Sequence, residues 1–152
     1  MSATEALPTR QELLEMAAGF REACVLGAAA ELDVFTAIGE QRLSADEVAG
    51  QLRSDRRATQ MLLDALASMR LLAKASDRYS VPPELLLLLA DGTPGSVLPM
   101  IRHNMNILRN WSQLAWVVRA GIPGPRQASI RGFEEDRAAF LAAMHVVSGP
   151  VA

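Results

Sequence analysis

Residues 44–82, SADEVAGQLRSDRRATQMLLDALASMRLLAKASDRYSVP, constrain the fold more than any other part of the chain. Ser44 precedes Glu47 by three residues, the spacing of a capping box, in which each of the two side chains bonds the other residue's backbone N–H. A second capping residue, Ser54 or Asp55, stands just before the next apolar pattern, where N-caps are favoured. The stretch therefore predicts two short helices in succession.

The second of these helices leads into a small sheet. Its apolar residues recur at helical spacing and predict a buried stripe, namely Ala58, Leu62, Ala65, Leu66 and Met69. Short runs on either side of the turn Ser76-Asp77-Arg78 then predict two strands. Helix, turn, helix and hairpin, in this order, form a winged helix, a module that often reads DNA.

Long helices are predicted on both sides of this core. Leu14 and Ala18 lie on one helical face near the start, and Leu26 and Ala30 lie on one face of the next segment. Residues 96 to about 120 are apolar around most of the helix, a pattern typical of burial on several sides. We expect a last helix from about Glu134. The predicted fold is mainly α, a winged-helix core with a two-stranded β-wing inside long helices.

The composition favours a second copy as the cover for these helices. Half of the residues are apolar and the mean hydropathy is +0.14. A chain of this composition has more apolar side chains than a small core can bury. Each Leu or Val side chain left in water loses roughly 1.5–3 kcal/mol of the stabilisation that burial would give. We therefore expect an intertwined homodimer, in which Leu14, Ala18, Leu26 and Ala30 contact the partner.

Several classes of function and location are disfavoured by the residues present. Cys24 is the only cysteine, and His103 and His145 have no third ligand at metal spacing, so we expect no metal site. No G-x-G-x-x-G or P-loop occurs, and no residue is predicted to be catalytic. The start, MSATEALPTRQELLE, is no signal peptide, and the apolar run Leu85–Ala90 is far short of the roughly 20 residues that span a bilayer. We expect a cytoplasmic protein.

Reading of DNA stays open as an alternative function. The exposed first turn of the second predicted helix carries the candidate DNA contacts Arg56, Arg57, Thr59 and Gln60. The predicted wing adds Lys74 and Arg78. Residues 44–82 nevertheless hold six basic and five acidic side chains, whereas phosphate binding needs several uncompensated cations on one face. A structural winged helix is the favoured interpretation.

The order of these segments resembles the N-terminal dimerisation domain of S-adenosylmethionine-dependent O-methyltransferases, of the plant phenolic and bacterial polyketide-tailoring type. ACVLGAAAELDVFTAIGE is similar to that family's second helix, and LSADEVAGQL with RLLAKASDRYSVPPE resembles its winged-helix block. NMNILRNWSQLAWVVRAG and the Phe140-to-Met144 segment resemble its later helices. The resemblance covers nearly the whole chain.

This resemblance implies three segments: dimerisation helices over 1–40, a winged-helix-like core over 41–92, and dimer-interface and substrate-lid helices over 93–152. It implies an aromatic substrate near Met105, Asn106, Trp111, Phe140 and Met144. The family's cofactor-binding glycine-rich turn and its general-base histidine follow this domain. We therefore expect S-adenosylmethionine only in a longer parent protein, with this chain inactive alone, and its function to be dimerisation and substrate binding in secondary metabolism.

Overall fold

The computed structural model describes the backbone of residues 7–148 and the side chains of residues 7–145. The fold is mainly helical and carries one small antiparallel sheet. In chain order the elements are α1 (Arg10–Ala18), α2 (Phe20–Glu31), α3 (Val34–Ile38), β1 (Leu43–Ser44), α4 (Ala45–Leu52), α5 (Arg56–Ser68), β2 (Ala73–Ala75), β3 (Arg78–Ser80), α6 (Pro83–Leu89), α7 (Leu98–Trp111), α8 (Leu114–Ala120) and α9 (Phe133–Ser148).

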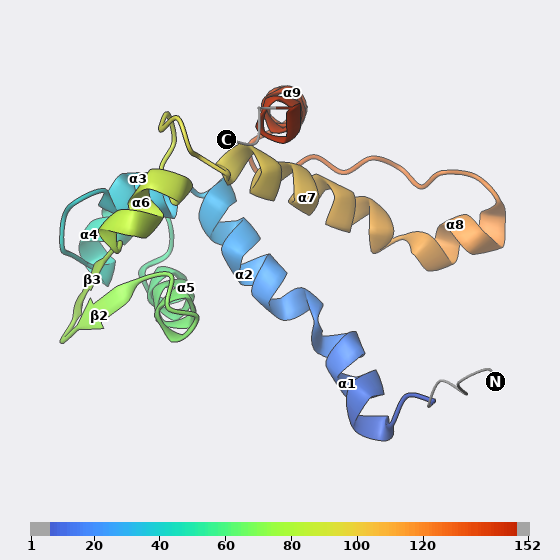
Figure 1. Cartoon of the computed structure of the whole chain (residues 1–152), viewed down its shortest axis with the longest axis horizontal. Helices are drawn as coiled ribbons and strands as arrows, with labels where there is room; N and C mark the ends of the chain where they lie inside the picture. Colours follow the sequence, from blue (N-terminus) through green and yellow to red (C-terminus); the bar gives the residue numbers. More distant parts are fainter. Residues whose placement is uncertain (1–6, 149–152) are drawn as a thin grey trace, which may run out of the picture.

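The elements form a body from which two arms extend (Figure 1). The body holds the short helices α3 to α6 and the sheet, and the far end of α2 packs into it. The first arm is α1 continued by the first turns of α2, and the second arm is the end of α7 continued by α8. The chain then returns along α7 to α9, which packs against α7.

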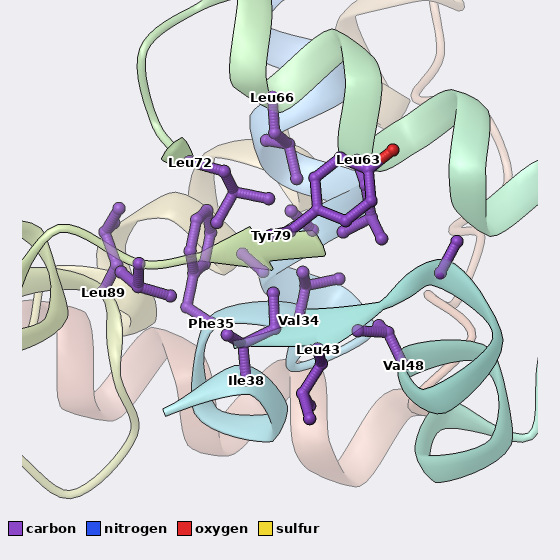
Figure 2. Packing of buried hydrophobic residues seen from close by; sticks show 14 of the residues in the cluster. Val34, Phe35, Ile38, Leu43, Val48, Leu63, Leu66, Leu72, Tyr79 and Leu89 are labelled. Carbon is purple, nitrogen blue, oxygen red and sulfur yellow. The ribbon is translucent and has the colours of Figure 1, made fainter. Parts of the chain in front are cut away.

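The body has an apolar core to which every one of its elements except β2 contributes. Figure 2 shows Phe35 and Val34 from α3 together with Leu63 and Leu66 from α5 and Tyr79 from β3, all of them fully or almost fully buried. The side chains point toward one another from several elements. This shared core fixes the positions of α2 and α5 relative to the sheet.

The buried stripe of α5 lies one position away from the predicted one. Thr59, Leu63 and Leu66 are the buried residues of this helix, a spacing of four and three that marks one helical face. Of the predicted stripe only Leu66 is fully buried, while Leu62 is half-buried. The prediction erred because Thr59, a polar residue, was not counted as a core position.

Both predicted helix starts are confirmed. The Ser44 hydroxyl accepts from the Glu47 backbone N–H, and the Glu47 carboxylate accepts from the Ser44 N–H at 2.7 Å, which is a complete capping box. Asp55, rather than Ser54, caps α5 by accepting from the Ala58 N–H at 2.8 Å. The α4–α5 pair is therefore specified by local sequence.

The sheet has three strands in the order β1-β3-β2, one more than predicted. β2 and β3 form the expected hairpin, with Lys74 opposite Tyr79. The additional strand, β1, is two residues long and pairs antiparallel with β3, with Leu43 opposite Tyr79. A run this short carries no alternation of apolar and polar residues that a sequence could reveal.

The long helix predicted over residues 96–120 is broken into α7 and α8. The Gln113 N–H bonds the Asn110 carbonyl at 3.1 Å, three residues back, in place of the Arg109 carbonyl that a continuous helix would use. The Ser112 hydroxyl, at 2.7 Å, and the Gln113 amide, at 3.3 Å, donate to the Arg109 carbonyl. Side chains that compete for backbone groups in this way interrupt a helix.

The expected burial of this segment on several sides is wrong for the single chain. No residue of α8 is buried, and Trp111 and Trp116 are 66% and 69% exposed. α1 likewise contains no buried residue, and its large apolar side chains Leu13, Leu14 and Met16 are all more than half exposed. Both arms therefore present large apolar side chains to solvent. Among the described residues, no helix is both long and apolar enough to cross a bilayer.

Candidate functional site

A cavity of about 620 Å³ lies between α7, α9 and the loop that joins α8 to α9. Its size is that of a small-molecule pocket. The side chains that line it combine aromatic rings with amides and charged groups: His103, Asn106, Asn110, Arg126, Gln127, Phe133, Asp136, Arg137 and Phe140.

Helical periodicity explains why these residues meet. His103, Asn106 and Asn110 on α7 are spaced by three and four residues, so they share one face of the helix. On α9, Phe133, Arg137 and Phe140 repeat the same kind of spacing. The two faces are turned to each other, and the His103 and Phe140 rings meet at a centroid distance of 5.1 Å with a 54° tilt.

The pocket is held against the body by an ion-pair cluster at the end of α2. Arg102, only 8% exposed, donates from Nε to the Ala30 carbonyl at 3.0 Å and pairs with Asp33. Arg131, just before α9, donates from Nη1 to the other Asp33 oxygen at 2.5 Å and to the Glu31 carbonyl at 3.3 Å. Both cations thus lie at the C-terminal end of α2, where the helix dipole favours positive charge.

A second ion pair fixes the orientation of Asn106. The Arg109 Nη1 donates to Glu31 Oε1 at 2.7 Å, and its Nη2 donates to the Asn106 side-chain oxygen. Arg109 Nε is buried without a hydrogen-bond partner among the described residues. With its oxygen engaged, Asn106 has its amide N–H groups as the remaining hydrogen-bonding groups toward a ligand.

The loop over the pocket is tied at two points, Pro125 and Ser129. The Gln113 amide donates to the Pro125 carbonyl at 3.1 Å. Asp136 accepts from the Ser129 backbone N–H at 2.8 Å and from the Ser129 hydroxyl. Both oxygens of this lining carboxylate are therefore used to position the loop.

The structure brings two of the five predicted substrate residues to the pocket. Asn106 and Phe140 line it. Met105 lies instead against α2, so close that a Cβ added at Gly27 would meet its sulfur. Trp111 is exposed on the second arm, and Met144, on α9, is 38% exposed. These last three residues are not among those that line the cavity.

The residues that sequence reasoning missed are mostly cationic or amide groups. His103 was discussed only with respect to metal binding, and Asn110, Arg126 and Arg137 were not singled out. The i, i+3, i+7 spacing from His103 to Asn110 was a usable signal once a pocket on α7 was expected. Arg126 stands in a loop, where no periodicity indicates which way it faces.

One of the four predicted dimer contacts is wrong. Ala30 is fully buried in the core of its own chain, so it has no surface to offer a partner. Leu14 is 52% exposed, whereas Ala18 and Leu26 are half-buried, and Leu26 packs against the core. The small side chain of Ala30 allows close packing within the body.

The residues proposed for DNA contact are largely engaged within the chain. Arg56 pairs with Asp46, and Thr59 is buried with its hydroxyl bonded to the Asp55 carbonyl at 2.7 Å, so Thr59 cannot reach a groove. Gln60 lines a small polar cavity beside the wing, and Arg57 is exposed.

The cations of the β2–β3 hairpin are neutralised as well. Lys74 pairs with Asp64 at 2.5 Å, and Arg78 pairs with Glu47 at 3.1 Å. Hydrogen bonds from Lys74 and from Tyr79 hold the pKa of Asp64 below its usual value. A face whose positive charges are paired in this way has little to offer a phosphate backbone.

The described residues do not fit S-adenosylmethionine or a metal. Strands β1 to β3 are two or three residues long, and in residues 7–148 none of them leads through a glycine-rich turn into a helix, the arrangement that binds a nucleotide-type cofactor. The same part of the chain holds no group of three or more His, Cys, Asp or Glu side chains placed to bind a metal ion.

Comparison with known proteins finds a family model that matches part of the chain. Residues 14–83 match the model of the O-methyltransferase dimerisation domain. The N,N-dimethyltransferase OxyT of Streptomyces rimosus is 28% identical over 130 residues, which are 82% of this chain and 37% of that protein.

Solved structures show the same fold. An O-methyltransferase family protein from Burkholderia thailandensis has a TM-score of 0.76 at 24% identity, covering 95% of this chain and 44% of that one. The N,N-8-amino-8-demethyl-D-riboflavin dimethyltransferase RosA of Streptomyces davawensis has a TM-score of 0.73 at 25% identity, covering 93% and 45%. The chain thus spans less than half the length of these relatives. Residues 14–83 of the chain thus match the O-methyltransferase dimerisation domain.

Proposed function

We propose that this chain is the dimerisation and substrate-binding part of an S-adenosylmethionine-dependent methyltransferase that acts on an aromatic or polyketide-like small molecule. The parent protein would bind the cofactor in a further domain and act in secondary metabolism. The similarity to OxyT and RosA, both named as dimethyltransferases, supports a methyl-transfer role. In this proposal the body, with its α4–α5 pair followed by a hairpin, is a winged helix with a structural role and does not read DNA.

The observation that carries the proposal is the uncovered state of the two arms. α1 has nine residues and α8 has seven, and none of them is buried. Helices shorter than about 12–15 residues are marginal in water without packing. Two short helices that carry Leu14, Trp116 and their apolar neighbours in the open therefore need a cover. A second copy of the chain, whose arms intertwine with those of the first, would cover both helices with apolar side chains of the same kind.

Sedimentation velocity on the chain tests this assembly. We expect a mass of twice 16.4 kDa at micromolar concentrations. Substitution of Leu14→Glu or Trp116→Glu places a charge in the apolar contact and should shift the protein toward monomer. Met61→Glu is the matched control, because Met61 is 65% exposed on the body, and it should leave the dimer intact.

A wild-type chain that remains monomeric at tens of micromolar would contradict the assembly. So would a dimer that is unaffected by both arm substitutions, since the interface would then lie elsewhere. Circular dichroism of each variant establishes that the body stays folded.

A further inference from the structure

The chemistry of the α7–α9 pocket narrows the class of molecule that it takes, and this inference rests on the proposed function. We propose that the pocket binds an aromatic molecule bearing a carboxylate, with the ring against Phe140 and His103 and the carboxylate between Arg126 and Arg137. The pairing of these two arginines with the aromatic wall of one cavity carries the inference.

The two pocket arginines differ from the other arginines around α7 in their partners. Arg102, Arg109 and Arg131 each pair with an acid of α2 or of the turn that follows it. Among the described side chains, residues 7–145, neither Arg126 nor Arg137 forms an ion pair with a carboxylate. Guanidinium groups bind carboxylates through paired N–H donors in a fixed planar geometry. The pocket therefore presents two uncommitted sites for an anion.

The charge balance of the lining favours a negative ligand. Asp136 is the only acid among the described residues that line the cavity, and its two oxygens accept from the Ser129 N–H and hydroxyl. Two arginines against one engaged carboxylate leave the lining with one net positive charge. An anionic ligand complements this lining, whereas a cationic one is repelled.

The aromatic part of the ligand is indicated by the rings in the same lining. The His103 and Phe140 rings lie 5.1 Å apart at a tilt of 54°, and Phe133 adds a third ring to the lining. Tilted aromatic neighbours leave ring edges and faces on which a planar ligand packs. The 620 Å³ cavity accommodates a two- or three-ring system together with its acid group.

A matched pair of probes separates the two parts of the inference. The affinity of the chain for 2-naphthoate is compared with that for 2-naphthamide, a neutral molecule of nearly the same shape, by isothermal titration calorimetry. We expect the acid to bind about tenfold more tightly than the amide, as a charge-assisted contact provides. Arg126→Gln and Arg137→Gln should each remove most of this preference and leave the affinity for the amide within about twofold.

Two further variants make the result specific. Arg119→Gln, on α8 and outside the lining, should leave both affinities unchanged. Phe140→Ala should weaken both probes alike, because it removes ring contact without changing charge. Thermal melting of each variant identifies any that is unfolded.

Equal binding of acid and amide would overturn the proposed substrate class and leave the pocket in place. A preference for the acid that survives both arginine substitutions would also overturn it, and so would binding of neither probe at millimolar concentration. The mass of the protein in solution, measured separately by sedimentation velocity, reports on the dimer alone. Failure of the anion inference is thus distinguishable from failure of the proposed assembly.

Discussion

Replacement of Arg102 with Met should destabilise the chain by about 1–4 kcal/mol. The largest contribution comes from the Ala30 carbonyl, which is buried near the end of α2 and accepts from Arg102 Nε at 3.0 Å. Leaving a buried acceptor without a partner costs about 1–3 kcal/mol. Loss of a cation at the helix C-terminus adds about 0.3–1 kcal/mol.

The ion pairs of Arg102 add little to this magnitude. Asp33 and Asp91 are 36% and 50% exposed, and pairs with exposed acids are worth about 0–1 kcal/mol. Asp33 also retains Arg131 as a second partner. Met keeps much of the apolar stem of Arg102, so the loss measures the guanidinium rather than a cavity.

Urea unfolding at a fixed protein concentration measures this loss, with the m-value reporting whether the folded state stays compact. Arg102→Lys should lie between the wild type and Arg102→Met, because an ammonium keeps the charge but not the planar donor set. Arg57→Met, at an exposed position of α5, serves as the matched control and should change stability by less than about 0.5 kcal/mol. An Arg102→Met variant as stable as the Arg57→Met control would refute the reasoning.

Two other perturbations follow from the body. Ser44→Ala removes the capping hydroxyl of α4 and should lower the free energy of unfolding by about 1 kcal/mol, whereas Ser44→Thr should retain most of it; equal losses from both substitutions would contradict the capping role. The pKa of Asp64 is lowered by hydrogen bonds from Lys74 and Tyr79, so its contribution to stability is complete above the usual pKa of 3.8 and is lost as the pH falls through the lower, folded-state value. The stability difference between wild type and Asp64→Asn should therefore narrow between about pH 6 and pH 3 in urea titrations, and a difference that does not change with pH would exclude this linkage.

The parts of the fold that sequence could predict are those specified locally. Ser44 and Glu47 define the start of α4 by their spacing, and Asp55 defines that of α5. The break after Trp111 was missed because the residues responsible, Ser112 and Gln113, are compatible with a helix until their side chains take the Arg109 carbonyl. Whether such a side chain bonds backbone depends on its surroundings, since Gln113 also reaches the Pro125 carbonyl twelve residues away.

The candidate site, like the fold, could be predicted from the sequence only in part. Asn106 and Phe140 were expected from a resemblance and do line the cavity, but Met105, next to Asn106 in sequence, faces α2. Neighbouring residues of a helix point about 100° apart, so a one-residue difference decides between pocket and packing.

The rotation of α7 that makes this choice is set from outside the pocket. Arg102 and Arg109 reach from α7 to the end of α2, and Met105, between them, packs on Gly27 of α2. This face of the helix is thereby turned toward α2, and the residues one position further on, His103, Asn106 and Asn110, are left facing α9. The sequence shows two arginines seven residues apart, but only their acidic partners, some 70 residues earlier in the chain, determine which face of α7 lines the cavity.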